Sequence, residues 1–530
     1  MQISLRKGPA VALILLGLDA PLGCRKAEVP TQLPAAPSVR VYLFSNLAGA
    51  LEPCGCRKDM LGGMDHAAAL LAAGRAEAPQ RLLLGAGPLL FQDPELDPTR
   101  GDQDVWKAGA IADSLADLQL GAWAPGINDL AAGPTRLTEL AGRTHARLLA
   151  ANLHTPGVPF ASTASFEVGG YRVGVVGIGA SPDPTSAAPA LAEGARALQA
   201  SGAQIRVALV AAPRGEGLRL AEKVPGFSLV VLGNAQESGD GNDAPPAPTL
   251  VGDTLVVQTS NHLQTLAYVD FFVKGDDFSF QDGMGLQLEE RRQSIERRMG
   301  ELDRRLAAWR AEQPPAQERI SGAERDREKL ARELGSLAAP VTTSGSVFRY
   351  HLVEVRESAG SDAAVAGRMS DYYRRVNAYN REAFRDRTPA PAAPGSAHYV
   401  GASACASCHA EADGFWRGTQ HARAYQTLAT QFKEFNLDCV GCHVTGYNRP
   451  GGSTVTHVDA LQDVQCESCH GPGSRHAESS GSTELIRLRP EAGVCRGCHH
   501  TPHVADDWSV EQAWQRIVGP GHGAKSLPPK

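Results

Sequence analysis

The chain has no excess of positive charge. Its 530 residues contain 52 Lys and Arg against 58 Asp and Glu, a formal net charge of −6. Without a broad basic face the protein cannot neutralise many phosphates, which excludes a nucleic-acid-binding function. Long apolar runs are also lacking: residues 11–18 are apolar but too few to cross a bilayer as a helix. The length allows two or three domains, and the hydrophobic content of 42% is ordinary for globular protein.

Cysteine is scarce, with eleven in the whole chain, yet eight of the eleven fall in one repeated motif. Cys-x-x-Cys-His occurs at Cys405, Cys408 and His409; at Cys439, Cys442 and His443; at Cys466, Cys469 and His470; and at Cys495, Cys498 and His499. Two thiols at this spacing can add across the vinyl groups of a haem while the adjacent imidazole takes an axial position on its iron. Zinc knuckles are the alternative, but zinc needs no histidine directly after the second cysteine. The sequence therefore predicts four covalently attached haems c.

The N-terminus has the features of an export signal. Arg6 and Lys7 precede the short apolar run, and Leu22-Gly23-Cys24 then resembles the end of a bacterial lipobox, although Pro21 departs from the usual leucine. Lipidation of Cys24 would also remove an odd thiol from an oxidising compartment. We expect a signal peptide at 1–23, a tether at 24–38 and a periplasmic lipoprotein anchored to the membrane. Ordinary cleavage near residue 20 or 27, giving a soluble periplasmic protein, is the alternative.

The region 39–280 alternates short β-rich runs with Ala- and Leu-rich stretches. Strands are expected at 40–45, 81–85, 121–124, 172–178, 205–210, 228–232, 255–259 and 266–273, and helices at 64–74, 103–116, 134–142, 189–200 and 217–222. This alternation is typical of an α/β domain with a substantially parallel sheet.

The next region, 281–340, is highly charged and has helical periodicity. Apolar positions recur at Leu288, Ile295, Met299, Leu302, Leu306 and Trp309, and again at Leu330, Leu334 and Leu337. Pro314 and Pro315 interrupt the pattern, which favours an antiparallel helical hairpin over a dimerising coiled coil. We expect a connecting helical segment at 341–387, a semi-rigid Pro/Ala linker at 388–396 and a haem domain at 397–530.

Motifs in the first domain, taken in order, resemble those of the calcineurin-like metallophosphoesterase domain of periplasmic 5′-nucleotidases. The similar segments lie at 41–49, 62–64, 82–88, 126–129 and 233–236. The resemblance implies an α/β sandwich with two metal ions held by carboxylates and imidazoles. The family's ligand positions, however, are here Asn46, Ala48, Pro88, Ile127, Asn128, Asn234 and Gln236, with Pro213 where another histidine would stand. We therefore predict a degenerate, non-catalytic domain.

Cys54 and Cys56 lie beside the loop that carries the first metal ligands in that family. Two readings give them a function: a soft-metal site, or a redox-active thiol pair. A strained disulfide or two buried thiols would be purely structural. Two cysteines without a nearby histidine underfill a tetrahedral metal site.

The last part of the chain is similar to the tetrahaem cytochrome c-554 family, on motifs at 399–409, 416–421, 464–476 and 522–523. Its few aromatic residues cannot build a large core, so packed haems would supply much of the buried apolar surface, and we expect a mostly α, haem-packed domain that does not fold without haem. The resemblance implies that His421, His476 and His522 are distal ligands. The remaining haem, at Cys439 and Cys442, is then five-coordinate unless a spare histidine, His457 above all, closes it.

The leading hypothesis is electron transfer, with other redox proteins as donor and acceptor. A redox enzyme acting on a small nitrogen-oxide-type ligand at the open iron is the first alternative. An active 5′-nucleotidase-like phosphoesterase is the second, and the missing metal ligands oppose it. We expect His500 and His503 to lie in a solvated turn after the fourth motif.

Overall fold

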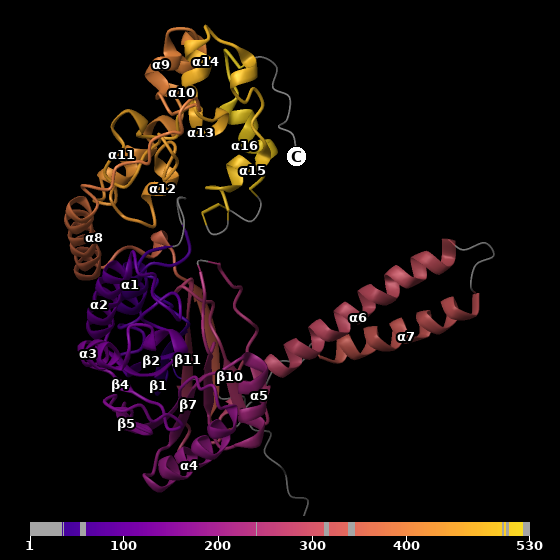
Figure 1. Ribbon diagram of the computed structural model, residues 1–530. Coiled ribbons are helices and arrows are strands. Elements are labelled where there is room, and N and C mark those ends of the chain that lie inside the picture. The colour runs from indigo at the N-terminus through magenta and orange to yellow at the C-terminus, as the bar shows by residue number, and fades with distance from the viewer. Residues whose placement is uncertain are drawn as a thin grey trace, which may run out of the picture.

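The computed structural model describes residues 34, 36–53, 60–239, 241–311, 317–337, 345–500, 503–504 and 508–522. These residues form a two-sheet domain, a projecting helical hairpin and a C-terminal region of short helices (Figure 1). The multidomain fold class expected from the sequence is confirmed. The expected signal peptide, Cys24, Cys54 and Cys56 lie outside the described residues.

Two sheets make up the first domain. The first has the order β12-β13-β11-β1-β2-β3-β4 and the second the order β5-β6-β7-β8-β10-β9. The first sheet contains β12 (Gln281–Asp282), β13 (Val347–Glu354), β11 (Thr265–Phe272), β1 (Val39–Ser45), β2 (Arg81–Gly87), β3 (Leu120–Pro125) and β4 (Arg147–Leu148). The second contains β5 (Thr163–Val168), β6 (Tyr171–Ile178), β7 (Ile205–Ala211), β8 (Leu229–Gly233), β10 (Thr254–Val257) and β9 (Thr249–Val251).

The central strands are apolar on both faces because both faces are covered. In β1, Val41 and Leu43 face the second sheet, whereas Tyr42 and Phe44 face the outer helices. Parallel pairing of β1 with β2 and of β2 with β3 accounts for these continuous apolar runs. The outer helices are α1 (Met64–Ala73), α2 (Gly101–Asp117), α3 (Pro134–Thr144) and α8 (Ala363–Ala383) on the first sheet, and α4 (Ala187–Ala200) and α5 (Arg214–Lys223) on the second.

The expectation of a purely helical segment at 341–387 is wrong, because this segment contributes β13 to the first sheet. β13 pairs antiparallel with β11, from Phe272 opposite Val347 to Thr265 opposite Glu354. Val347, Phe348 and Tyr350 are buried while Arg349 is exposed, as in a half-buried strand. The first domain therefore continues beyond residue 280, and the hairpin is an insertion between two strands of one sheet.

The helical hairpin consists of α6 (Leu286–Ala311) and α7 (Gln317–Ser336), and it projects from the domain (Figure 1). Leu306, Ile320 and Ala323 form a small core between its two helices, with Leu302 and Trp309 packed against it. Ion pairs such as Arg310 with Glu324 and Arg327 with Asp303 also join the helices. The arrangement agrees with a hairpin folded on its own chain.

Helix α8 lies between the first domain and the haem-motif region (Figure 1). Its buried residues recur at helical spacing and pack into the core under α1 and α2: Val365, Met369, Tyr372, Tyr373 and Val376. The linker after it is hydrogen-bonded to the haem-motif region: the carbonyl of Ala390 accepts a hydrogen bond from the N–H of Gly451 at 2.7 Å. The hydroxyl of Thr454 donates likewise to the carbonyl of Arg387 at 2.8 Å.

The C-terminal region is built from short helices with little apolar core. The α-helices are α9 (Ala402–Ala406), α10 (Ala410–Arg417), α11 (Ala424–Ala429), α12 (Val440–His443), α13 (Cys466–His470), α14 (Ser474–Glu478), α15 (Ala492–Arg496) and α16 (Val510–Ile517). This region also contains the short 3₁₀ turns η4 (His421–Arg423), η5 (Asp459–Leu461) and η6 (Thr483–Leu485). Three further 3₁₀ turns precede it in the chain: η1 (Ile127–Leu130), η2 (Pro184–Ser186) and η3 (Glu357–Ala359). Across the described ranges, no helix combines the length and the apolar character needed to cross a bilayer.

Candidate haem-binding site

Each Cys-x-x-Cys-His motif closes into one tight turn. The N–H of His409 donates to the carbonyl of Cys405 at 2.9 Å, and the N–H of His499 donates to that of Cys495 at 2.8 Å. The second and third motifs form the helices α12 and α13. None of the eight motif cysteines is in a disulfide. A turn of this kind brings both thiols and the imidazole of a motif close together, as attachment to one haem requires.

The motifs lie close together in pairs. The thiols of Cys442 and Cys498 lie within hydrogen-bonding distance, and this contact lowers the pKa of Cys442, against the effect of burial, and raises that of Cys498. A second thiol contact joins Cys405 and Cys466, raising the pKa of Cys405 and lowering that of Cys466. The first motif therefore neighbours the third, and the second neighbours the fourth.

Two pairs of imidazoles have the separation that one iron requires. The ring centroids of His409 and His476 lie 6.1 Å apart, and those of His421 and His499 also lie 6.1 Å apart. A metal ion held between two imidazole nitrogens at about 2 Å each puts the ring centroids roughly 6 Å apart. The structure thus pairs each of two motif histidines with one of the histidines expected to be distal ligands.

Backbone carbonyls orient several of these rings. Nδ1 of His443 lies 2.6 Å from the carbonyl oxygen of Ala424, Nδ1 of His470 lies 2.7 Å from that of Arg487, and Nδ1 of His476 lies 2.9 Å from that of Ser482. Since a carbonyl oxygen only accepts, each Nδ1 carries the proton. The Nε2 lone pair is then left for a metal, as in most histidine-ligated sites.

Burial keeps these imidazoles neutral. It is the main cause that lowers the pKa values of His421, His443, His470 and His499 below the ordinary value. A metal ligand must be neutral, so the environment favours the form that binds iron. The ring separations and tautomers fit haem c.

The remaining histidines lie in different surroundings. His522, the third expected distal residue, neighbours His470 of the third motif. His503 neighbours His443 of the second motif. His457, which the sequence favoured as an extra ligand, instead has Nδ1 3.2 Å from the hydroxyl oxygen of Thr456 and 3.4 Å from that of Thr454.

Glu467 holds the first and third motifs together, a role that sequence reasoning missed. It lies inside the third motif, is 2% exposed, and accepts hydrogen bonds from the backbone N–H groups of Val400, Gly401 and Gly473. The distances are 3.0, 2.7 and 2.7 Å. The sequence shows only a glutamate between the two cysteines of the motif, and its burial is what reveals the role, because charged residues are rarely buried without partners.

In the first domain, amides occupy the phosphoesterase ligand positions and bond to the protein itself. Asn46 is buried and its Oδ1 accepts the N–H of Asn234 at 2.6 Å. The side chain of Asn128 is fully buried; it donates to the carbonyls of Phe91, Gln92 and Glu237 and accepts from the N–H of Glu237. Among the residues that the structure describes, no group of three or more His, Cys, Asp and Glu side chains is arranged to hold a metal ion.

Comparison with known proteins supports both halves of the molecule. Residues 404–471 match the family described as cytochrome c554 and c-prime, a range that contains three of the four motifs. Cytochrome c-554 of Nitrosomonas europaea is 37% identical over 93 residues, covering 14% of this chain and 40% of that protein. The chain thus spans less than half the length of this relative. The match identifies a c-type cytochrome region, which implies covalently bound haem c.

Solved structures similar to the chain include 5′-nucleotidases. The 5′-nucleotidase precursor from Thermus thermophilus has 18% identity and a TM-score of 0.43, covering 67% of this chain and 61% of that one. The NAD nucleotidase of Haemophilus influenzae has 15% identity and a TM-score of 0.37, covering 45% and 48%. The recognition of a cytochrome c-554-like region is confirmed.

Proposed function

We propose that this protein is a four-haem electron-transfer cytochrome that exchanges electrons with other redox proteins. The observation that carries the proposal is the pair of 6.1 Å imidazole separations, His409 with His476 and His421 with His499. Ligation by two histidines keeps an iron low-spin in both redox states, so little rearrangement accompanies each electron.

The proposed ligand sets follow from the ring pairs and neighbouring charges. His409 and His476 would hold the first iron, His470 and His522 the third, and His499 and His421 the fourth. His443 would hold the second, with its sixth position open. Bound haem c would supply iron centres that accept and release one electron at a time.

The first domain is proposed to be a scaffold without hydrolytic activity. The side-chain hydrogen bonds of Asn128 go to backbone groups, and alanine and proline at positions 48 and 88 have no ligand atom. We expect no metal-dependent phosphate release from nucleotides. Activity that EDTA abolishes and Mn²⁺ restores would contradict this reading.

The proposed location is the periplasm, with the chain held at the membrane by lipid on Cys24. The export features of the N-terminus and the cytochrome c-554 likeness support it. Replacing Cys24 with Ala should release the protein from the membrane fraction or block its processing. A wild-type protein found only in the soluble fraction would favour ordinary signal cleavage.

The deciding experiment combines haem counting with spectroscopy of the oxidised and reduced protein. The mass should carry four haems, and EPR should separate low-spin iron from a high-spin centre. Reduced protein should bind about one carbon monoxide per chain. His421→Ala should open a second iron, and His457→Ala should change nothing.

Wild-type protein with only low-spin iron and no carbon monoxide binding would show that the second iron is closed. It would also remove redox chemistry on a small ligand as a function. His503→Ala would then be the variant expected to reopen it, because His503 neighbours His443.

A further inference from the structure

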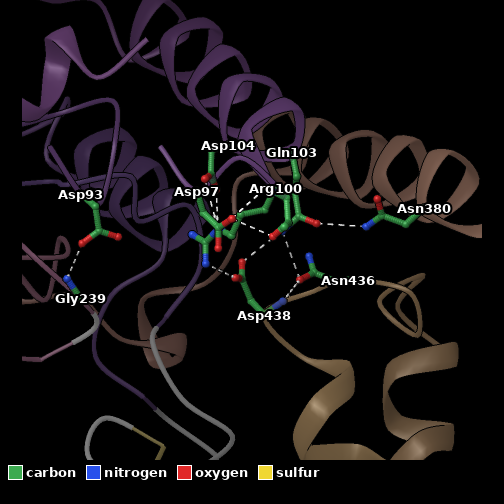
Figure 2. Close-up of polar contacts among 10 residues, drawn as sticks. Asp93, Asp97, Arg100, Gln103, Asp104, Gly239, Asn380, Asn436 and Asp438 are labelled. Carbon is green, nitrogen blue, oxygen red and sulfur yellow. Dashed lines mark hydrogen bonds and ion pairs between the residues drawn. The ribbon is translucent and has the colours of Figure 1, made fainter. Parts of the chain in front are cut away.

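The seven residues before the second haem motif, 432–438, lie against the first domain rather than within the haem-motif region. Figure 2 shows the polar part of this contact, where α2, α8 and the segment meet. Its members are tied as follows: Lys433 to Glu52, Glu434 to Asn377, the carbonyl of Phe435 to Asn380, Asn436 to Gln103, and Asp438 to both Arg100 and Gln103. The segment is therefore hydrogen-bonded to the first domain along most of its length.

Three buried amides form the centre of the contact, and we call Asn380, Gln103 and Asn436 the amide bridge. Each is 2% exposed. Asn380 Nδ2 donates to Gln103 Oε1 at 3.1 Å, and Gln103 Nε2 donates to Asn436 Oδ1 at 3.4 Å and to Asp438 Oδ2 at 3.2 Å. Arg100 closes the arrangement by donating to Asp438 Oδ1 at 2.7 Å (Figure 2).

The amide bridge ends at the backbone that begins the second motif. Oδ1 of Asn436 accepts the N–H of Asp438 at 2.8 Å, and its carbonyl accepts the N–H groups of Cys439 at 3.1 Å and Val440 at 3.0 Å. Asn436 therefore fixes the first turn of α12, which carries Cys439 and His443. Gln103 is connected to this turn through its hydrogen bonds to Asn436 and Asp438, so a shift of Gln103 would move the turn.

The other end of the segment is strained, and the first domain offsets the strain. Phe432 has φ of 59°, a left-handed conformation that is rare for a bulky residue. Its ring lies under the guanidinium of Arg374, 4.0 Å from ring centroid to Cζ, and packs against the core of the first domain. Strain of this kind persists where the surroundings over-determine it, often at functional sites.

Helix α8 also adjoins the segment before the motif. The amino group of Lys433 lies 4.4 Å from the centroid of the Tyr373 ring. Burial and then the charge of Glu52 raise the pKa of Tyr373 well above its ordinary value. Hence the segment that leads into the second motif packs against residues of the first domain.

We propose that the first domain positions the second haem: through the amide bridge and Arg100 it sets the orientation of the turn that carries Cys439 and His443. Gln103, Asn380 and Arg100 are positioning residues, and none touches the haem-binding groups. The inference rests on the proposed four-haem function and gives the non-hydrolytic domain its role. Partners that orient metal ligands from outside are known to matter nearly as much as the ligands.

The test is Gln103→Leu in the full chain, which removes the amide group at similar volume. Haem content should stay at four by mass. The rate of carbon monoxide binding to the open iron should change about tenfold, and the EPR signal of one haem of four should shift while the others keep theirs. Arg100→Ala should move the same readouts in the same direction, and it decides the matter if Gln103→Leu does not fold.

The matched control is Asn152→Leu. Asn152 donates to the carbonyl of Gly179 and accepts its N–H, both at 2.9 Å, so this variant also removes a hydrogen-bonded amide from the first domain, but away from segment 432–438. Gln103→Leu or Arg100→Ala with four haems, wild-type carbon monoxide kinetics and a wild-type EPR spectrum would overturn the proposal and leave the four-haem function standing.

If wild type has no open iron, the EPR signal of the second haem is the readout, and an unchanged signal in Gln103→Leu overturns the proposal. Wild-type protein that carries no covalent haem would instead refute the proposed four-haem function itself.

Discussion

Asp129 shows how a buried charged group in the first domain serves the fold. Its carboxylate is fully buried and accepts backbone hydrogen bonds from Leu89 at 2.9 Å, Leu90 at 2.8 Å and Gly126 at 2.9 Å. Burial raises its pKa to about 7, and the three hydrogen bonds only partly oppose this. With Asn46 and Asn128 bonded to neighbouring backbone, polar groups at this place stabilise loops instead of binding metal.

The raised pKa of Asp129 predicts a pH dependence of stability. The folded state binds the proton more tightly than the unfolded state, so the group's contribution to the free energy of unfolding is full near pH 4 and is lost as pH rises to about 7. Over this range wild type should lose about 4 kcal/mol relative to Asp129→Asn, at about 1.4 kcal/mol per unit. Denaturant unfolding followed by circular dichroism at several pH values measures this. The exposed Asp253→Asn is the control, and a flat difference between Asp129→Asn and wild type would contradict the prediction.

Glu467→Ala should destabilise the haem-motif region. The change leaves the N–H groups of Val400, Gly401 and Gly473 without their acceptor, at a cost of about 3 kcal/mol. Thermal unfolding monitored at the haem absorption band is the measurement. Glu467→Gln retains one acceptor oxygen and should lose less, and the exposed Glu484→Ala should match wild type.

At the scale of elements, the pattern of apolar residues predicted those strands and helices that depend on contacts between residues close in sequence. The buried strands β1, β2, β6 and β7 follow from short apolar runs, and the hairpin helices follow from apolar periodicity broken by Pro314 and Pro315. Strand β13 was missed because its exposed Arg349 and Leu352 blur its pattern and helices flank it on both sides. Nothing local indicates that Val347 pairs with Phe272 across the inserted hairpin.

The hairpin should unfold by itself when its own core is weakened. Leu306, Ile320 and Ala323 form a cluster separate from those of the two-sheet domain. Leu306→Ala should cost the hairpin about 2–4 kcal/mol. Hydrogen exchange should then accelerate in α6 and α7 while β1, β2 and β11 keep their protection. Ala308→Gly, at an exposed site of α6, is a milder control of about 1 kcal/mol. Faster exchange throughout the first sheet would show that the hairpin is coupled to the domain.

At the scale of the whole molecule, the motif cysteines and histidines were predictable because covalent attachment imposes a fixed spacing. The resemblance to a known family indicated His476 as a distal ligand, but its pairing with His409 came only from the structure, since 67 residues separate them. The contribution of Gln103 and Asn380 was not predictable. Gln103 donates to Asn436, and Asn380 donates to Gln103 and to the carbonyl of Phe435. These bonds join segments more than fifty residues apart, and buried amides carry no sequence signature.

The two halves should therefore differ in their dependence on haem. The first domain has extensive apolar clusters of its own, whereas the cluster found among the haem motifs consists of Val440, Val444 and Val458 with Tyr425 and Tyr447 packed against it. A variant with all eight motif cysteines replaced by Ala should keep the first domain folded and leave the part beyond residue 397 open to proteolysis, because haem would no longer supply its buried surface. Limited proteolysis with mass spectrometry should return a resistant fragment containing α1 to α8.

Replacing only Cys439 and Cys442 should remove one haem and leave the remaining motifs protected, which separates the loss of one haem from the loss of all four. A C-terminal part that resists protease without any haem would mean that its short helices pack by themselves. The apolar core of the C-terminal part would then include more residues than the small cluster around Val440.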